Sequence, residues 1–514
     1  MNSISKIQEV YNEIENIVGK DYLSDKDFMK AAYSRNVDPA FPDRWADIIV
    51  RPESTEEVAE IVKIANKYKI PITPRGGGAD LVGGSATDEG ILMDLTRMNK
   101  ILEINEDDFY CVVECGITWG DLVSQLHQKG LTTGVLGPGS GYSATIGGGL
   151  SNSTAGFGST KNGLVTEICL GVEVVLGDGT IIKTGAAANK YAEPFCRYGV
   201  APDFTGLFMG DVGTMGIKTK AYLKLNPLAP FKRRKDYMLT KNNYTQVYEI
   251  FKELQTEVKD GLVDALCIPL TVVKLLSGIV ENKPPKRPRL KGSVFLLYLE
   301  AYDERVLDIY MEKVDKIMKK DNRCREFEFH EMDLDEPLTK DWKFNLKFVF
   351  NYFNKYISIM PEMISCTTCH KVPISYIPEA VTKSHAFDAK FMSEFPEKSV
   401  SLFATIIYLL PNGHCVFVGG LNAFNREDQH QIAMDIWHKK LRAQVKYGGA
   451  HYWLGESISQ SITEAGAYEP EFERFFRDMK KTVDPNYLLS PKKFHMYRYE
   501  DKFSNYLVED EPYD

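Results

Sequence analysis

The stretch 74-PRGGGADLVGGS-85 holds five glycines in twelve residues and is the segment on which the fold depends. It follows the apolar run Ile70–Thr73, and Arg75 lies at its start. Glycine permits positive φ and lets backbone amides approach a ligand closely. Consecutive amides beside an arginine form an anion-binding concavity. The pattern is typical of a pyrophosphate cradle, and equally of a long turn between two strands.

Length and composition narrow the class of protein. The chain has 514 residues, of which 44% are hydrophobic and 26% charged, which predicts two globular domains. A net charge of -9 argues against a nucleic-acid partner. The sequence shows no apolar run long enough to cross a bilayer and no export signal at its start. The nine cysteines are scattered, which suits a reducing compartment, so we expect a soluble cytoplasmic protein.

Hydrophobic spacing predicts a mixture of helices and strands up to about residue 225. The predicted elements there are a helix over 56–69, strands over 91–95, 101–104 and 110–114, a helix over 116–130 with Thr118 as N-cap, and a hairpin of 172–176 with 180–183. From Ala229 the chain becomes poorer in glycine. Strands over 265–268, 293–300, 405–410 and 415–420 and helices over 244–259, 303–319 and 427–445 predict a second α+β domain with an antiparallel sheet.

A second glycine cluster, 139-GSGYSA-144, matches the dinucleotide fingerprint GxGxxG/A. That fingerprint requires a helix directly after it. We expect residues 145–149, TIGGG, not to form a helix because of their three glycines. The sequence therefore argues against a Rossmann fold.

Six blocks in this order resemble the FAD-binding domain of the vanillyl-alcohol-oxidase superfamily, also called the PCMH-type flavoproteins. The blocks are PRGGGAD (74–80), DLTRMNKILEI (94–104), FYCVVECGITWGDL (109–122), PGSGYSATIGGGLSNS (138–153), GVEVVLGDGTIIKTG (171–185) and FTGLFMGDVGTMGIKT (204–219). The segment 482-TVDPNYLLSPKKF-494 resembles the C-terminal tail of that family.

The resemblance implies an α+β fold: a PCMH-type FAD-binding domain made of two α/β subdomains, and a cap domain with an antiparallel sheet flanked by helices. The implied boundaries are 1–46 for an N-terminal helical segment, 47–228 for the FAD-binding domain, 229–465 for the cap and 466–514 for a tail that returns to the FAD-binding domain.

The resemblance also assigns FAD contacts to three loops. The first glycine loop would bind the pyrophosphate, the second would follow the ribityl chain and the isoalloxazine, and a third would hold the adenine side. The residues concerned are Pro74, Arg75, Gly76, Gly77, Gly78, Ala79 and Asp80; Pro138, Gly139, Ser140, Ser143, Ala144, Thr145, Gly147, Gly148, Ser151, Asn152 and Gly158; and Gly213, Gly216 and Ile217.

The mode of FAD attachment follows partly from Ala79. Relatives that tether FAD from the first loop have a histidine beside the glycines, where this chain has Ala79. We therefore expect non-covalent FAD on that side. His414 and Cys415 correspond to a strand from which some relatives attach FAD, so a tether through either residue stays open.

The catalytic candidates are Tyr452, His451 and His414. Tyr452 matches a tyrosine that helps to bind a phenolate in relatives, but Trp453 replaces the arginine that follows it there. Both residues of the pair 451–452 could instead be buried in an aromatic strand. His414 could be a base, a tether or a plain strand residue.

The implied reaction is hydride transfer from a small hydroxylated molecule, an alcohol or aromatic alcohol, to flavin N5. One alternative is a D-2-hydroxyacid dehydrogenase with a cap metal held by His414, His451 and Glu456. Another is an electron-relay subunit with 283–291 and 366–370 as contacts. We expect a small-molecule substrate, a redox partner protein and a homo-oligomer.

The motif 366-CTTCH-370 has the spacing of a c-type haem attachment site. Its two thiols and histidine could also bind a metal or take part in redox chemistry. The third interpretation is that these are ordinary residues of a pocket wall or core.

Overall fold

The structure, a computed structural model, describes residues 3–34, 44–80, 82–241, 243–270, 292–327, 363–365, 368–394, 399–425, 430–452 and 454–510. The chain begins with a small sheet in the order β1-β2-β4-β3, in which β2, β4 and β3 are parallel. Helices α1 and α3 pack on one another and share a hydrophobic core with this sheet. The elements are α1 Ser3–Val18, β1 Leu23–Ser24, α2 Asp27–Ser34, β2 Ile48–Val50, α3 Thr55–Tyr68, β3 Ile72–Arg75 and β4 Ile91–Asp94.

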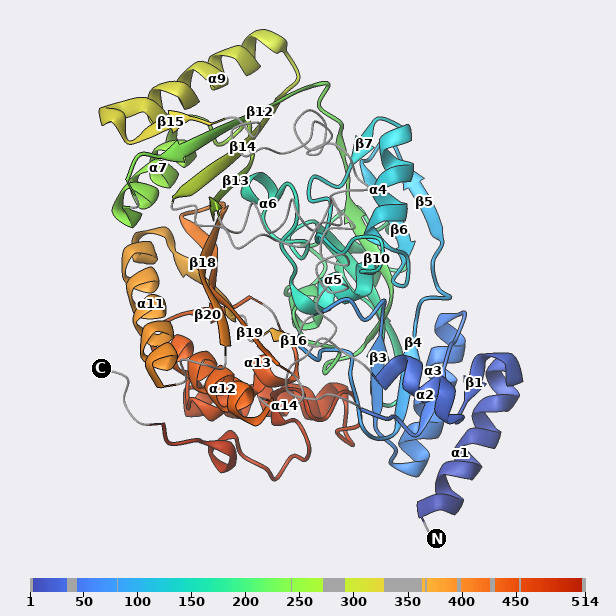
Figure 1. The fold of residues 1–514 in the computed structure, drawn as a ribbon. Coiled ribbons are helices and arrows are strands. Elements are labelled where there is room, and N and C mark those ends of the chain that lie inside the picture. Colours follow the sequence, from blue (N-terminus) through green and yellow to red (C-terminus); the bar gives the residue numbers. More distant parts are fainter. Residues whose placement is uncertain are drawn as a thin grey trace.

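A second sheet follows with five strands in the order β5-β6-β10-β8-β9 (Figure 1), and all its pairings are antiparallel. Helices α4 and α5 share a buried core with this sheet, and Trp119 is fully buried there. The elements are β5 Ile101–Asn105, β6 Tyr110–Glu114, α4 Trp119–Gln128, β7 Leu131–Thr132, α5 Ile146–Asn152, α6 Ser159–Asn162, β8 Cys169–Val175, β9 Ile181–Lys183, β10 Ile217–Lys224 and β11 Asn226–Pro227.

The third and largest sheet is antiparallel, with the order β15-β12-β14-β13-β18-β19-β17-β20 and with β16 paired to β19. Its strands are β12 Phe231–Leu239, β13 Leu262–Pro269, β14 Ser293–Ala301, β15 Cys324–Glu326, β16 Met363–Ser365, β17 Thr368–Pro373, β18 Ser399–Leu410, β19 His414–Asn425 and β20 Ala450–His451. The later helices are α7 Tyr244–Glu257, α9 Glu304–Lys319, α11 Ile377–Glu394, α12 His430–Lys446, α13 Glu456–Glu464 and α14 Pro470–Val483.

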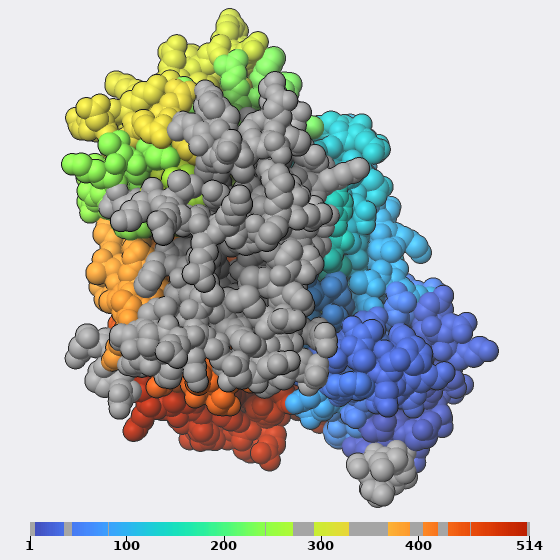
Figure 2. Space-filling view, viewed as in Figure 1, coloured from blue at the N-terminus to red at the C-terminus, as the bar shows by residue number. Residues whose placement is uncertain are grey.

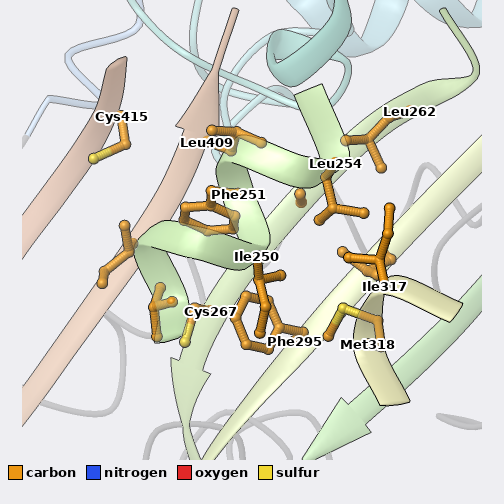
Figure 3. Packing of buried hydrophobic residues seen from close by; sticks show 14 of the residues in the cluster. Ile250, Phe251, Leu254, Leu262, Cys267, Phe295, Ile317, Met318, Leu409 and Cys415 are labelled. Carbon is orange, nitrogen blue, oxygen red and sulfur yellow. The ribbon is translucent and has the colours of Figure 1, made fainter. Parts of the chain in front are cut away.

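Strands β13 and β14 of the large sheet bury side chains on both faces, and the alternation of side chains along a strand decides what each face contacts. Cys267, Phe295, Leu409 and Cys415 lie on the face that is covered by α7, α9 and α11. Figure 3 shows Phe251 of α7 among these strand residues. The side chains that lie between them along the same strands point to the other face of the sheet. That face is therefore turned toward the glycine-rich part of the chain.

The last segment of the chain returns to the first sheet. Residue Ile72 of β3 forms a parallel bridge with Leu489, through hydrogen bonds from Ile72 N to Leu488 O and from Ser490 N to Ile72 O, each 2.8 Å long. In Figures 1 and 2 the C-terminal residues, in red, accordingly reach the N-terminal residues, in blue, along the lower edge of the molecule.

The predicted α+β fold class is confirmed, but the prediction for residues 145–149 is wrong. They begin helix α5, with Thr145 as N-cap: its side chain accepts a hydrogen bond from Gly148 N (3.3 Å). Tertiary packing explains the glycines, because a Cβ on Gly149 would lie 2.7 Å from Trp119 Nε1 and one on Gly147 would lie 2.9 Å from Cys115 Cβ. None of the described helices has the length and apolar character needed to cross a membrane.

Candidate active site

A cavity of about 410 Å³ lies between the glycine loops and the large sheet. Its volume is within the range of about 300–1,000 Å³ that small-molecule sites usually have. Two chemically different halves make up its wall. One half is glycine-rich backbone with Arg75 and Lys218, and the other half consists of side chains from β13, β14, β18 and β19.

The glycine-rich half gathers most of the predicted FAD contacts. The predicted residues in its lining are Pro74, Arg75, Gly76, Gly77, Gly78, Ala79, Asp80, Pro138, Gly139, Ser140, Ala144, Thr145, Gly147, Gly148, Ser151, Asn152, Gly213 and Gly216. Because these residues come from three separate loops, the fold brings together what the sequence resemblance assigned to one ligand.

The first loop presents free donors to the cavity. The backbone amides of residues 76–79 make no hydrogen bond to any described part of the chain. Arg75 Nη1 is buried and likewise has no partner among the described residues. Burial lowers the pKa of the Arg75 guanidinium, which Asp80 and Asp94 oppose. A buried cation and four open amides fit the pyrophosphate of FAD.

The two glycine loops lie in direct contact. A Cβ on Gly77 would lie 1.6 Å from the carbonyl oxygen of Ser143, and a Cβ on Gly76 would lie 2.1 Å from Thr145 Oγ1. Glycine is therefore required here for the approach of one loop to the other, in addition to any approach of a ligand.

Some predicted FAD contacts have other partners. Asp80 lines the cavity, but its carboxylate accepts hydrogen bonds from Val82 N (3.0 Å) and Gly84 N (2.9 Å), so it also closes its own loop. Ser143, Gly158 and Ile217 do not lie in the lining. Ser143 Oγ donates to Ser140 O (3.0 Å), and Ile217 is buried in the core of the first sheet. The Gly158 amide donates to Asp264 (2.8 Å).

The half of the cavity formed by the large sheet is mainly aliphatic and aromatic. The residues of this half are Asp264, Leu266, Ile268, Leu296, Tyr298, Ile406, Tyr408, Val416 and Val418, with Phe157, Cys369, Tyr452 and Leu454 beside them. The only cations in the described lining, Arg75 and Lys218, belong to the other half, and Lys218 is ion-paired with Asp211 (2.7 Å).

Asp264 is fully buried and is the one carboxylate among the described residues of this half. Its Oδ2 accepts the Gly158 amide, and its Oδ1 contacts the hydroxyl of Tyr408. Burial raises the pKa of Asp264 to about 7, although the hydrogen bonds from Tyr408 and from the backbone act in the opposite direction. An ordinary aspartate is fully ionised at that pH. The position is thus suited to hold or release a proton near neutrality.

Tyr452, which is a catalytic candidate from the sequence, lies in the cavity wall. Its hydroxyl accepts a hydrogen bond from Ala155 N (2.6 Å) and donates one to Ala155 O (3.1 Å). Burial raises the pKa of Tyr452. The ring is consequently fixed against the backbone that follows α5, with its phenol neutral. The neighbouring Trp453 lies outside the described residues.

The two histidines proposed as catalytic lie outside the cavity lining. His451 is buried, shares a hydrogen bond with Ser461 Oγ (2.6 Å), and burial lowers its pKa to about 3. His414 is half-buried at the first residue of β19, and burial lowers its pKa. Cys415 points to the opposite, helix-covered face of the sheet, as Figure 3 shows, so the geometry does not favour a tether from this thiol.

The described part of the 366–370 motif is divided between two faces of β17. Cys369 is fully buried and lines the cavity, whereas the ring of His370 packs on Phe417 with 5.0 Å between centroids. Cys366 lies outside the described residues. Of the three interpretations, the described residues fit that of a pocket wall.

The variant metal site does not assemble in the described chain. Glu456 is engaged by Arg44 (2.6 and 3.0 Å) and by Lys493 (2.8 Å), and His451 bonds to Ser461. Across the residues that the structure describes, no group of three or more His, Cys, Asp and Glu side chains is placed to hold a metal ion.

Asp264 and Tyr408 are functional candidates that the sequence did not indicate. They are 144 positions apart and meet only because β13 and β18 are neighbours in the sheet. A usable signal was present in 262-LVDALCIP-269, where one carboxylate interrupts an apolar strand. A charged residue in such a run is rarely buried without a partner.

Comparisons with known proteins agree with this geometry. Residues 46–185 match the family described as "FAD binding domain". The chain is 30% identical over 318 residues to glycolate oxidase subunit GlcD of Bacillus subtilis, which covers 61% of this chain and 63% of that protein. It is 25% identical over 454 residues to a mitochondrial D-lactate dehydrogenase (cytochrome) of Arabidopsis thaliana, which covers 87% of this chain and 73% of that one.

Solved structures with the same fold are also known. The 4-ethylphenol oxidase of Gulosibacter chungangensis, solved as an isoeugenol complex, superposes with a TM-score of 0.79 at 18% identity, over 96% of this chain and 98% of that one. The likeness therefore covers the FAD-binding part, the large sheet and the tail together.

Proposed function

We propose that the chain, which carries a match to a FAD binding domain over residues 46–185 and shares the fold of a 4-ethylphenol oxidase, oxidises a small uncharged alcohol, aliphatic or aromatic, in the cavity beside the large sheet. Bound FAD would supply the hydride acceptor, its N5 atom. The glycine loops and Arg75 hold the cofactor. The aliphatic wall binds the carbon skeleton of the substrate, and Tyr452 positions its hydroxyl.

The observation that carries this proposal is the chemistry of the wall opposite the glycine loops. The six aliphatic side chains Leu266, Ile268, Leu296, Ile406, Val416 and Val418 line it, and no lysine or arginine is among the described residues that line this wall. A buried carboxylate that lacks a cationic partner is strongly disfavoured. A neutral alcohol has no such requirement, and its hydroxyl can bond to a tyrosine.

The sequence relatives favour a second candidate, a D-2-hydroxyacid. The names of the Bacillus and Arabidopsis proteins refer to glycolate and D-lactate. Such a substrate brings a carboxylate, for which an arginine or lysine is the usual partner. The described part of the substrate wall offers neither, so we place the hydroxyacid second.

An anaerobic comparison of substrates tests the proposal. The FAD-loaded protein is mixed with benzyl alcohol, 4-hydroxybenzyl alcohol, 1-butanol, glycolate or D-lactate, and the loss of flavin absorbance is followed. We expect at least one neutral alcohol to reduce the flavin and both hydroxyacids to be inactive. Reduction by a hydroxyacid alone would replace the proposal with its second candidate.

The electron acceptor is measured in the same protein. The word "subunit" in the name of the Bacillus relative makes a protein partner a reasonable acceptor to test. Oxygen uptake during turnover would identify an oxidase, and turnover that needs an added dye would point to a partner. The homo-oligomer and the cytoplasmic location stay predictions from the sequence.

A further inference from the structure

The contacts of the Tyr408 hydroxyl require more hydrogens than the tyrosine itself carries. Its oxygen lies within hydrogen-bond reach of two acceptors, Asp264 Oδ1 and the carbonyl oxygen of Gly156, and it also accepts the Ser159 amide (3.3 Å). A tyrosine hydroxyl has one hydrogen, and a carbonyl oxygen has none. A protonated Asp264 carboxyl group would supply the second hydrogen.

A neutral Asp264 satisfies every one of these contacts. Its carboxyl group donates from Oδ1 to Tyr408, Tyr408 donates to Gly156 O, and Oδ2 still accepts the Gly158 amide (2.8 Å). When Asp264 is ionised, the single hydrogen of Tyr408 is donated to the carboxylate. Gly156 O then receives no hydrogen bond from Tyr408. The site thus has two proton arrangements that differ by one proton on Asp264.

We propose that Asp264 and Tyr408 form the proton-accepting pair of the proposed oxidation. The hydroxyl proton of the alcohol passes to the Tyr408 oxygen, and the hydrogen of Tyr408 passes at the same time to ionised Asp264. The carbon would lose its hydride, with both electrons, to bound FAD, and the C–O bond would become a carbonyl. The products are the carbonyl compound, reduced flavin and neutral Asp264, so atoms and charge balance.

The location of the pair supports this role. Both residues line the cavity on its substrate side. The raised pKa of Asp264, about 7, keeps an ionised fraction present at neutral pH, while its protonated form is stable in the buried site. The Tyr452 hydroxyl donates its hydrogen to Ala155 O, whereas the Tyr408 hydroxyl lies in contact with a carboxyl group.

The other titratable groups around Asp264 do not account for titration near neutrality. Tyr408 on β18 and Tyr298 on β14 face it, and burial raises the pKa of each well above the ordinary value. Glu300 on β14 acts on Asp264 from a greater distance and is ion-paired with Lys161 of α6 (2.9 Å). A proton change near neutrality at this site therefore belongs to Asp264.

The first test reads the protonation state without any substrate. Infrared spectra of the FAD-loaded protein are recorded while the pH is raised across neutrality, and the carbonyl stretch of a neutral carboxyl group is followed. We expect a band that disappears with a midpoint near pH 7, that is absent in Asp264→Asn, and that is unchanged in Asp178→Asn, a control at an exposed turn. A wild-type protein without this band overturns the proposal.

The second test measures how proton transfer to the pair affects the oxidation of a substrate, and it rests on the proposed function. The rate of anaerobic flavin reduction by benzyl alcohol should rise with pH to a plateau in the wild type, because the ionised acid is the base. Asp264→Asn should lower this rate by about 10²- to 10⁴-fold and remove the inflection. Tyr408→Phe should do the same while Tyr452→Phe keeps the inflection.

The two tests separate the two claims. If Asp264→Asn folds, binds FAD and keeps the wild-type pH profile, the pair is structural and the proposal is wrong. If the infrared band is present but neither benzyl alcohol nor 1-butanol reduces the flavin, the proposed function fails and the proton-accepting role fails with it. The protonation of Asp264 would then stand alone as a structural property.

Discussion

Replacing Arg75 with methionine should weaken FAD binding without weakening the folded apoprotein. The guanidinium is buried, and its Nη1 has no partner among the described residues. Burial removes water from the charge, so a bound anion can supply the missing hydrogen-bond acceptor. The cation–π contact of Arg75 with the Tyr33 ring (5.3 Å from the centroid) offsets only about 0.5–1 kcal/mol of the cost of burying the charge. The cation should therefore contribute mainly to the holoprotein.

The size of the effect follows from the bond that is lost. A hydrogen bond to a charged group contributes about 1.5–3 kcal/mol. At about 1.4 kcal/mol for each tenfold change, the Kd for FAD should rise by about 10- to 150-fold in Arg75→Met. Arg75→Lys should fall between the two proteins, because lysine keeps the charge but not the fork of donors.

The assay is titration of apoprotein with FAD, read by the quenching of flavin fluorescence, together with a thermal melt of each apoprotein. Arg305→Met is the matched control, since Arg305 is 89% exposed and pairs with Asp303 on the surface. Two results would refute the reasoning. One is an unchanged Kd, and the other is an apoprotein that loses as much stability as the holoprotein.

Three further changes have defined outcomes. Gly77→Ala places a Cβ 1.6 Å from Ser143 O, so we expect a lower Tm and weaker FAD uptake, whereas Gly148→Ala, whose Cβ meets only a side-chain oxygen at 3.3 Å, should change the Tm much less. Tyr452→Phe leaves a buried backbone amide and carbonyl without their partner, which should destabilise the protein by about 1–3 kcal/mol in urea unfolding. Burial holds the pKa of His451 at about 3, so the unfolded chain takes up a proton there below about pH 6.5 and the folded chain does not. Stability should then fall with decreasing pH by up to about 1.4 kcal/mol per unit from this group, and His451→Gln should flatten the slope in a pH series of melts.

The cofactor half of the site could be predicted from the sequence because its determinants are local. In the loops 74–85 and 138–149 the glycines that permit unusual backbone conformations are close together in the sequence, so the sequence alone reveals them. The fold then brings the two loops to one cavity. The resemblance of six ordered blocks to one family predicts that these loops meet in one cavity. A single loop would not support that prediction.

The substrate half could not be predicted in the same way. Asp264 and Tyr408 come from different strands of an antiparallel sheet, and their contact depends on the pairing of β13 with β18. Alternation along each strand indicates which residues share a face, but not which face meets the cofactor. The sequence around His451 predicts a catalytic role, but in the structure its ring forms a hydrogen bond with Ser461.

Helix α5 shows the limit of local propensity. Three consecutive glycines argue against a helix in isolation, but here the absence of side chains lets the helix pack against Trp119 and Cys115. Tertiary contact overrides propensity at this point. The same glycines place Thr145, the N-cap of the helix, in the cavity wall.

We infer that this cavity removes a hydride from the carbon of an uncharged alcohol. The most direct measurement is anaerobic reduction of the FAD-loaded protein by benzyl alcohol and by benzyl alcohol deuterated at the carbon that bears the hydroxyl. We expect the flavin to be reduced in both cases, and more slowly by the deuterated compound. Flavin that stays oxidised with both compounds, or that is reduced at the same rate by both, would contradict this inference.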